Sequence, residues 1–455
     1  MTQWLSDRIE SFADRPCFIH QEQTHSYGDL ASEIRKIEQT LEKSDIREGD
    51  LVLLKADYSL QSVATLLALF NLRVIVAPAT ALSSSEIASR ISAANLKWQV
   101  SLRGKNLEIL ATTNADPTHS LVASLQEQKH PGLILFSSGS TGKPKAMVHD
   151  ANHLLKSFEK KRTRRLSILI FLLFDHIGGL NTLFNGLASG AKIIIPESRN
   201  PHKVARAIQA HAVKLLPASP TFLNLLILSG ACEAHDLSSL RFVTYGTEPM
   251  PESLLKRLKH TLPHTKFIQT FGTSETGISQ TISRASDSTQ IKIEDPNTEY
   301  KIVDGELWLR SDNQILGYLN HEMSQFTEDG WFKTGDSVLE SNDGYLTIVG
   351  RREDIINVGG EKVTPSEVEN ILLEIPEVAD CLVYGEDNAI TGQNVAAQIV
   401  PHERTDLNAL KRKIKNHCRK SLNHFKVPAR ILFPEAELFG KRFKKTRKPI
   451  KENDD

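Results

Sequence analysis

The chain has 455 residues, of which 40% are apolar and 24% charged, a composition typical of a globular protein with about two to four domains. Lysine plus arginine and aspartate plus glutamate number 55 each, so the formal net charge is zero. Residues 411–451 nevertheless hold fifteen lysines and arginines against two glutamates, a net charge of +13, which leaves −13 for the rest. A basic end on an acidic chain indicates a polyanionic partner, such as nucleotide phosphates, an acidic protein, nucleic acid or a membrane.

Several classes of protein are excluded by what the sequence lacks. The four cysteines, Cys17, Cys232, Cys381 and Cys418, are scattered without a C-x-x-C pair, which argues against a zinc site and a disulfide framework. The N-terminal segment is acidic and has no apolar stretch typical of a signal peptide. The longest apolar run, residues 166–174, is too short to span a membrane and predicts a buried strand. We therefore expect a soluble cytoplasmic protein.

Helical periodicity alternates with short β-branched runs through most of the chain, which favours an α/β architecture with largely parallel sheets. The expected strands are 51–55, 74–76, 192–195, 214–216 and 241–243, and the expected helices are 59–72, 204–211, 220–228 and 252–260. From about residue 299 the pattern changes to short strands and D-G turns, which predicts a β-rich segment.

The C-terminal part of the chain has elements of its own. After Arg351 we expect helices at 366–374 and 407–421 and strands at 381–384 and 396–400. The predicted fold class is therefore α/β. It has a large N-terminal domain of parallel and mixed sheets with helices plus a β-rich subdomain, residues 1–350, and a small mobile α+β C-terminal domain, residues 351–455.

The segment Leu133–Asp150, LILFSSGSTGKPKAMVHD, carries the strongest chemical signal. An apolar strand runs into a loop whose glycines let the backbone approach a ligand, whose hydroxyl and N–H groups suit phosphate oxygens, and whose lysines supply charge. The loop is not a Walker A sequence, because Ser137 stands where the first glycine belongs and Pro144 follows Lys143.

This loop resembles that of the adenylate-forming superfamily, which comprises acyl- and aryl-CoA synthetases, adenylation domains of peptide synthetases, and luciferases. In that family the loop grips the β- and γ-phosphates of ATP. The resemblance gives this role to Ser137, Ser138, Gly139, Ser140, Thr141, Gly142, Lys143 and Lys145. Four further motifs of the family follow in order, and together they cover nearly the whole chain.

The second motif is QTFGTSETG, residues 269–277, which is similar to the family's Y-G-x-T-E signature. The resemblance implies that Phe271, next to Gly272, stacks on adenine and that Ser274 contacts the α-phosphate. Glu275 would hold Mg²⁺, since a hard carboxylate suits a hard cation. Upstream, YGTEPMPE resembles the adenine-side loop and implies that Gly246, Thr247 and Glu248 line the nucleotide.

The third and fourth motifs are GWFKTGD, which ends at Asp336, and GRREDIINVGGEKVTPSEVE, which begins at Gly350. By resemblance, Asp336 accepts hydrogen bonds from both ribose hydroxyls and Arg351 contacts ribose and phosphates. Glu353 occupies the hinge about which the C-terminal domain turns between two half-reactions. The backbone of Gly359 and Gly360 would let a pantetheine arm pass.

The fifth motif, FPEAELFGKRFKK, is similar to P-x-x-x-x-x-G-K and aligns Pro434, Gly440 and Lys441. Lys441 is then the catalytic lysine that reaches both the carboxylate and the α-phosphate. Its ammonium group would neutralise charge where two anions must meet.

The acyl pocket has the least regular motif, FLLFDHIGGLNTL, residues 171–183, which resembles the family's P-x-x-H-x-x-G segment with leucine for proline. The resemblance places Asp175, His176 and Gly178 at the pocket. An aspartate here binds the substrate ammonium in the amino-acid-activating branch, whereas the H-I-G-G alignment favours CoA ligases. The basic run KKRTRR, residues 160–165, has no interleaved aromatic residues, so we expect a solvated helix end and no nucleic-acid partner.

The resemblance implies ATP- and Mg²⁺-dependent activation of a carboxylic acid to an acyl-AMP, with release of pyrophosphate, then transfer to the thiol of coenzyme A. One alternative stays open: a stand-alone enzyme that loads a carrier protein's phosphopantetheine arm, because the basic C-terminal region suits either anion. The matches at Glu275, Asp336 and Lys441 disfavour a non-catalytic AMP-binding regulator. The acid itself, whether fatty, aromatic or amino, is not identified by the sequence.

Overall fold

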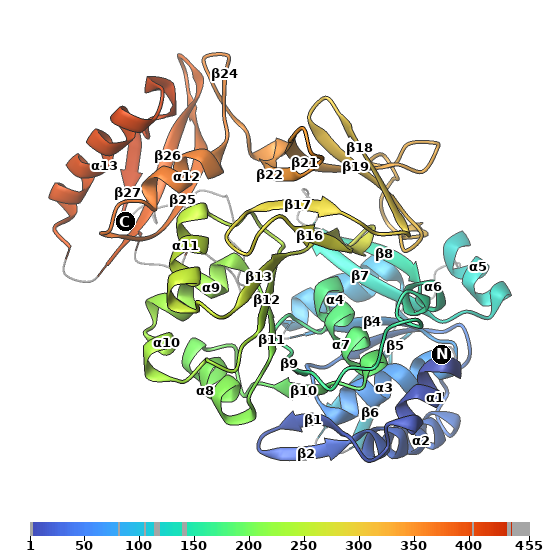
Figure 1. Cartoon of the computed structure of the whole chain (residues 1–455). Coiled ribbons are helices and arrows are strands. Elements are labelled where there is room, and N and C mark those ends of the chain that lie inside the picture. The colour runs from blue at the N-terminus through green and yellow to red at the C-terminus, as the bar shows by residue number, and fades with distance from the viewer. Residues whose placement is uncertain are drawn as a thin grey trace.

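The computed structural model describes residues 3–80, 82–103, 106–112, 119–138, 143–402, 405–434 and 438, with the side chains of Arg103 and Ser138 excepted. These residues form a large unit, residues 3–351, and a small unit, residues 356–434 (Figure 1). The large unit contains two seven-stranded sheets and one six-stranded sheet, and the small unit contains one five-stranded sheet.

The first seven-stranded sheet has the order β13-β12-β11-β9-β10-β1-β2, and all its strand pairs are parallel except the terminal β1–β2 hairpin. Its strands are β1 (Pro16–His20), β2 (Gln23–Ser26), β9 (Ser167–Leu169), β10 (Lys192–Ile195), β11 (Leu215–Ala218), β12 (Phe242–Tyr245) and β13 (Lys266–Gln269).

The second seven-stranded sheet has the order β20-β8-β7-β4-β3-β5-β6, with a parallel centre and antiparallel edges. Its strands are β3 (Leu51–Lys55), β4 (Ile75–Ala79), β5 (Trp98–Arg103), β6 (Asn106–Ala111), β7 (Gly132–Ser138), β8 (Pro144–Asp150) and β20 (Gly317–Tyr318).

One core joins both of these sheets through the helices α2, α3 and α7. Helix α3 is buried at ten of its twelve residues, which is why its sequence is apolar on all sides. The outer faces are covered by α8, α9 and α11 on the first sheet and by α4 and α5 on the second. The helices of the large unit are α1 (Gln3–Ser11), α2 (Tyr27–Glu42), α3 (Leu60–Asn71), α4 (Ser84–Ala94), α5 (Ser120–Gln128), α6 (Ala151–Lys156), α7 (Ile177–Ser189), α8 (Pro201–His211), α9 (Pro220–Leu228), α10 (Ala231–Ala234) and α11 (Glu252–Thr261).

The β-rich segment forms the antiparallel six-stranded sheet β16-β17-β22-β21-β19-β18, which lies above the two larger sheets in Figure 1. Its strands are β16 (Thr281–Ser283), β17 (Gln290–Ile293), β18 (Thr298–Val303), β19 (Glu306–Ser311), β21 (Phe332–Glu340) and β22 (Leu346–Arg351). A separate hairpin, β14 (Phe271–Thr273) and β15 (Gly277–Ser279), precedes it.

The small unit begins after a 3₁₀ turn, Arg352–Asp354, that follows β22. Its sheet has the order β24-β23-β26-β25, with β27 paired to β26, and α12 and α13 pack on it. The elements are β23 (Ile356–Val358), β24 (Glu361–Val363), α12 (Pro365–Leu372), β25 (Val378–Asn388), β26 (Gly392–Pro401), α13 (Leu407–Ser421), a 3₁₀ turn (His424–Lys426) and β27 (Arg430–Leu432).

The predicted fold class is confirmed: the molecule is α/β, with mixed sheets, a large N-terminal unit and a smaller C-terminal unit. One expected strand is wrong in extent. The apolar run 166–174 is a strand only at Ser167–Leu169. Phe171, Leu172 and Leu173 leave the sheet and line a cleft, so the apolar run reflects burial against two different surroundings.

Candidate active site

A cleft of about 1310 Å³ lies between the large and the small unit, and most of the predicted site residues that the structure describes belong to its lining. The parallel strands β11, β12 and β13 point their carboxyl ends toward it, because Ala218, Gly246 and Thr270 all belong to its lining. Ligands of open α/β sheets bind beyond the carboxyl ends of the strands, so this is the expected place for a substrate site.

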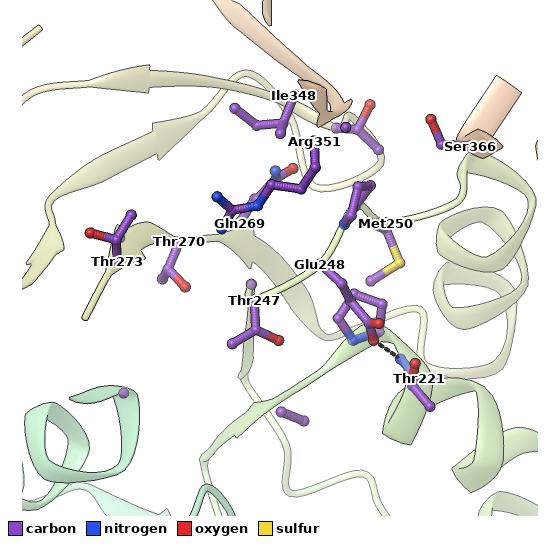
Figure 2. Close-up of a pocket in the computed structure, with 18 of the residues that line it drawn as sticks. Thr221, Thr247, Glu248, Met250, Gln269, Thr270, Thr273, Ile348, Arg351 and Ser366 are labelled. Atoms are coloured by element: carbon purple, nitrogen blue, oxygen red, sulfur yellow. Dashed lines mark hydrogen bonds between the residues drawn. The ribbon is translucent and has the colours of Figure 1, made fainter. Parts of the chain in front are cut away.

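The loop after β12 supplies three predicted residues to this lining, Gly246, Thr247 and Glu248. A Cβ atom on Gly246 would lie 2.7 Å from the carbonyl oxygen of Thr270, so only glycine fits there. Thr247 adopts a left-handed backbone with φ of +73°, which a β-branched residue rarely does. The Glu248 carboxylate accepts a 2.7 Å hydrogen bond from the N–H of Thr221 at the start of α9 (Figure 2).

The hairpin β14–β15 presents Gly272, Ser274 and Glu275 to the same cleft. The Glu275 carboxylate accepts a hydrogen bond of 3.2 Å from the Tyr318 hydroxyl. Burial, together with the Glu275 charge, raises the pKa of Tyr318, so this phenol stays a donor. Phe271 is only 9% exposed and packs in the core of the six-stranded sheet, so little of its ring surface is available to a ligand.

A buried histidine supports this hairpin from behind. His149, on β8, is 1% exposed. Burial lowers its pKa to about 4, and the backbone of Ser274 and Asn313 opposes part of that shift. The imidazole is therefore neutral at neutral pH, and its protonation would place an uncompensated charge behind the Ser274–Glu275 turn.

Asp336 and Arg351 lie opposite each other on β21 and β22, with 3.1 Å between the Arg351 Nε and an Asp336 carboxylate oxygen. Asp336 is buried, whereas Arg351 lines the cleft and points into the same space as Thr247 and Thr270 (Figure 2). Glu306 accepts hydrogen bonds from the N–H of Gly335 and from Arg352, and so fixes the turn just before Asp336.

His176 and Gly178, at the start of α7, also belong to the cleft lining. The His176 ring accepts the N–H of Gly178 at 3.1 Å and caps the helix. The next residue, Gly179, is required sterically, since a Cβ there would lie 2.1 Å from the carbonyl oxygen of Leu173.

The structure corrects the expectation for Asp175. Its side chain is 2% exposed, does not belong to the cleft lining, and forms a buried ion pair of 3.0 Å with Arg90. Because Arg90 already balances this carboxylate, Asp175 is not placed to bind an ammonium group in the cleft.

Glu353, the predicted hinge, lies in the 3₁₀ turn between β22 and β23 and lines the cleft. Gly359 and Gly360 form the β23–β24 turn, with φ of +60° and +95°, and do not belong to the lining. A Cβ on Gly360 would meet nothing within 4 Å, so the turn conformation, rather than crowding, explains this glycine.

The phosphate loop and the catalytic lysine are placed only in part. Ser137 and Lys145 line the cleft, and Lys143 is exposed at the end of the loop. The other predicted residues lie outside the described part of the chain: Gly139, Ser140, Thr141, Gly142 and Lys441, together with the side chain of Ser138.

Sequence reasoning missed several residues that the structure brings to the site: Tyr318 and His149 beside the Ser274–Glu275 turn, and Asn224 and Arg257 in the cleft wall. Each acts through a residue distant in the sequence. Tyr318, Asn224 and Arg257 lie outside the motifs, and His149 lies at the end of the phosphate-loop segment, where its pairing with the hairpin has no sequence signal. The basic segment 160–165 forms no helix, and its backbone contacts Arg8 and Ser189.

Comparison with known families decides the assignment. The family model for the AMP-binding enzyme matches residues 5–319, and that for the AMP-binding enzyme C-terminal domain matches residues 367–447. The chain belongs to the AMP-binding enzyme family. The resemblance read from the motifs is thereby confirmed, and with it the prediction of an adenylate-forming enzyme.

Several relatives of this AMP-binding enzyme are ligases that use coenzyme A. It is 28% identical to a 2-succinylbenzoate–CoA ligase of Bacillus licheniformis, with 94% of this chain and 95% of the relative covered. It is 27% identical to a 4-coumarate–CoA ligase of Humulus lupulus, over 94% of this chain and 89% of the relative. The predicted reaction class, acid–thiol ligation, agrees with these relatives.

Solved structures show the same fold. The o-succinylbenzoate CoA synthetase of Bacillus subtilis in complex with its acyl-adenylate has a TM-score of 0.79 at 23% identity, over 99% of this chain and 98% of that one. The anthranilate CoA ligase AuaEII in complex with anthranoyl-AMP has a TM-score of 0.81 at 20% identity, over 97% and 95%. No helix in the described residues is both long and apolar enough to cross a membrane.

Proposed function

We propose that this AMP-binding enzyme joins an aromatic carboxylic acid to coenzyme A through an enzyme-bound acyl-AMP. The observation that carries the proposal is the convergence in one cleft of the adenine-side loop, the Glu275 carboxylate, the Arg351 guanidinium and the apolar segment Phe171–Leu173. The names of the relatives support an aromatic acid and coenzyme A as the acceptor.

The first half-reaction must bring two anions together. A carboxylate oxygen of the acid attacks the α-phosphorus of ATP, the bond from that phosphorus to the bridging oxygen of the β-phosphate breaks, and pyrophosphate leaves. Arg351 and Lys145 line the cleft and supply positive charge, and Lys441 is proposed to neutralise the reacting anions. Asp336, held by Arg351, is proposed to accept the ribose hydroxyls.

The site also fits the magnesium ion that the family implies. Mg²⁺ in nucleotide sites is typically held by one or two carboxylates and by substrate phosphates. Glu275 presents one such carboxylate to the cleft, and the hydrogen bond that the Tyr318 hydroxyl donates to it fixes its orientation. Bound there, Mg²⁺ would neutralise phosphate charge. Among the described residues, no cluster of three or more histidine, cysteine, aspartate or glutamate side chains forms a dedicated metal cage.

In the second half-reaction the thiol sulfur attacks the acyl carbon, the bond to the AMP phosphate oxygen breaks, and the thiol proton passes to solvent. We propose that the small unit first turns about Glu353, which removes Lys441 and brings the Gly359–Gly360 turn to the cleft. The position of Glu353 between the two units supports this hinge.

The decisive experiment is a panel of aromatic, fatty and amino acids, each assayed for ATP–pyrophosphate exchange and then for thioester formation. The acceptors are coenzyme A in one arm and a phosphopantetheinylated carrier protein in the other. We expect exchange with an aromatic acid and thioester formation with coenzyme A. Exchange with no acid at all would overturn adenylation, and thioester formation with the carrier alone would replace coenzyme A as the acceptor.

Lys441→Ala should separate the two half-reactions, because Lys441 is proposed to act only in adenylation. We expect single-turnover adenylation to fall at least about 100-fold, or ~2.7 kcal/mol, while thioester formation from preformed acyl-AMP is retained. Lys448→Ala, in the same basic segment, is the matched control and should adenylate normally. A loss below about tenfold for Lys441→Ala would withdraw the assignment.

A further inference from the structure

A polar contact inside the cleft joins the large unit to the small one. Asn224, on α9, donates from its side-chain amide to the carbonyl oxygen of Ala379, 155 residues away, at 3.2 Å. The amide oxygen of the same side chain accepts a 3.0 Å hydrogen bond from Arg257 on α11. In Figure 1, α11 lies directly below α12 and β25 of the small unit, and α9 lies next to α11. Asn224 therefore bridges a residue of its own unit and the backbone of the other.

The surroundings of this contact are buried and charged. Asn224, Ala379 and Asp380 are 4%, 5% and 7% exposed. Burial lowers the pKa of Arg257, and the charge of the Asp380 carboxylate, from the small unit, opposes that shift. Breaking a buried hydrogen bond, such as that from Asn224 to Ala379, costs more than breaking one at the surface, because the groups left behind lose their partners.

The same helix also reaches the nucleotide side of the cleft. The N–H of Thr221, one turn before Asn224, binds Glu248 of the adenine-side loop (Figure 2). Helix α9 is thus tied at its start to the proposed nucleotide site and along its length to the small unit. In this arrangement the Gly359–Gly360 turn does not line the cleft, so the contact belongs to an orientation of the small unit other than the one proposed for the thiol.

We propose that Asn224 and Arg257, with the Ala379 carbonyl and Asp380, form a latch that holds the small unit in its adenylation orientation and opens for thioester formation. Asn224 and Arg257 are positioning residues, because they act through the orientation of the small unit. This inference rests on the proposed two-step function. A latch of this kind shifts the balance of two orientations by its own interaction free energy and by no more.

Asn224→Asp tests the latch with the least change of shape. An aspartate keeps an acceptor for Arg257 but turns an oxygen, in place of a donor, toward the Ala379 carbonyl. We expect single-turnover adenylation to fall at least about fivefold, the worth of ~1 kcal/mol, while thioester formation from preformed acyl-AMP is unchanged or faster. Arg257→Gln should shift the two rates in the same direction. Asn106→Asp, on an exposed hairpin of the large unit, adds the same charge outside the cleft and should change neither rate.

A distance between the units provides a readout that does not depend on activity. Spin labels at Glu127→Cys on α5 and Asn416→Cys on α13, both exposed positions, report the orientation of the small unit in a Cys232→Ala background. We expect Asn224→Asp to move population to a second distance without any substrate. Equal loss of both half-reactions with unchanged distances, or a raised KM for the acid alone, would overturn the latch. If the wild-type protein adenylates no acid, the proposed function fails and the distances alone decide the latch.

Discussion

The two walls of the cleft are built differently. On the large unit, three residues that face the cleft are held by partners in other elements: Glu248 by Thr221, Glu275 by Tyr318, and Arg351 by Asp336. On the small unit, α12 presents carboxylates that are satisfied within that unit, since Glu367 pairs with Lys426 and Glu369 accepts the N–H of Val383.

This difference suits the two walls to different functions, ligand binding for the large unit and movement for the small unit. The wall of the large unit is arranged in advance for a ligand, which lowers the cost of ordering on binding. The wall of the small unit keeps its own bonds when it moves. Among the described residues, bonds from Ser366 to Val349 beside the hinge and from Asn224 to Ala379 cross between the units, and a rotation would have to exchange them. The following experiments test this division.

Asp336→Ala should have the largest effect, because it removes the proposed acceptor of the ribose hydroxyls and leaves Arg351 without its carboxylate. We expect kcat/KM for ATP in the exchange assay to fall about 100-fold, or ~2.7 kcal/mol. Asp343→Ala, on an exposed turn of the same sheet, is the matched control. A fall in kcat/KM of less than about fivefold would show that Asp336 does not bind the ribose hydroxyls.

Acid should destabilise the large unit through His149. Its native pKa of about 4 lies below the ordinary 6.5, so the unfolded chain binds this proton more readily. The stabilisation is complete above about pH 6.5 and is lost as the pH falls toward 4. Between pH 7 and pH 5 the expected loss is ~2 kcal/mol, measured by urea unfolding. His149→Gln should lose that part of the pH dependence, and a variant with the wild-type slope would contradict the prediction.

Glu369→Ala should lower the stability of the protein without changing its affinity for ATP. It leaves the buried N–H of Val383 without the Glu369 acceptor, so we expect the free energy of unfolding to fall by ~1.5 kcal/mol. KM for ATP should stay within about twofold, because the wall of the small unit is satisfied internally. Glu367→Ala, which removes only a partly exposed ion pair with Lys426, is the control. A raised KM without a change in stability would show that Glu369 touches substrate.

Thr247→Gly should have the smallest effect and the opposite sign for stability. Glycine relieves the left-handed strain of this β-branched residue. We therefore expect the free energy of unfolding, measured by thermal denaturation, to rise by about 0.5–1 kcal/mol, with no gain in activity. Ala212→Gly relieves a similar φ of +48° at the end of α8, outside the cleft lining, and should stabilise without touching activity. Faster adenylation by Thr247→Gly would contradict the expectation that relief of the strain brings no gain in activity.

Much of the fold follows from local pattern. The expected helices at 204–211, 220–228, 252–260 and 407–421 are found within a few residues of their predicted bounds, because an apolar stripe at helical spacing needs only one core to pack against. The run 166–174 differs, since its apolar residues are divided between the sheet and the cleft wall. Apolar character alone does not distinguish these two forms of burial.

Short motifs were enough to identify the family, the reaction class and loop residues that line the cleft, because tight backbone turns depend on short runs of particular residues such as Gly246–Glu248. Long-range packing, by contrast, sets the pairings of the side chains: Tyr318 with Glu275, Arg90 with Asp175, and Asn224 with the backbone of the small unit. These pairs join residues 43, 85 and 155 positions apart. No local sequence pattern predicts these pairs, because their partners come within hydrogen-bonding distance only when whole sheets and helices pack together.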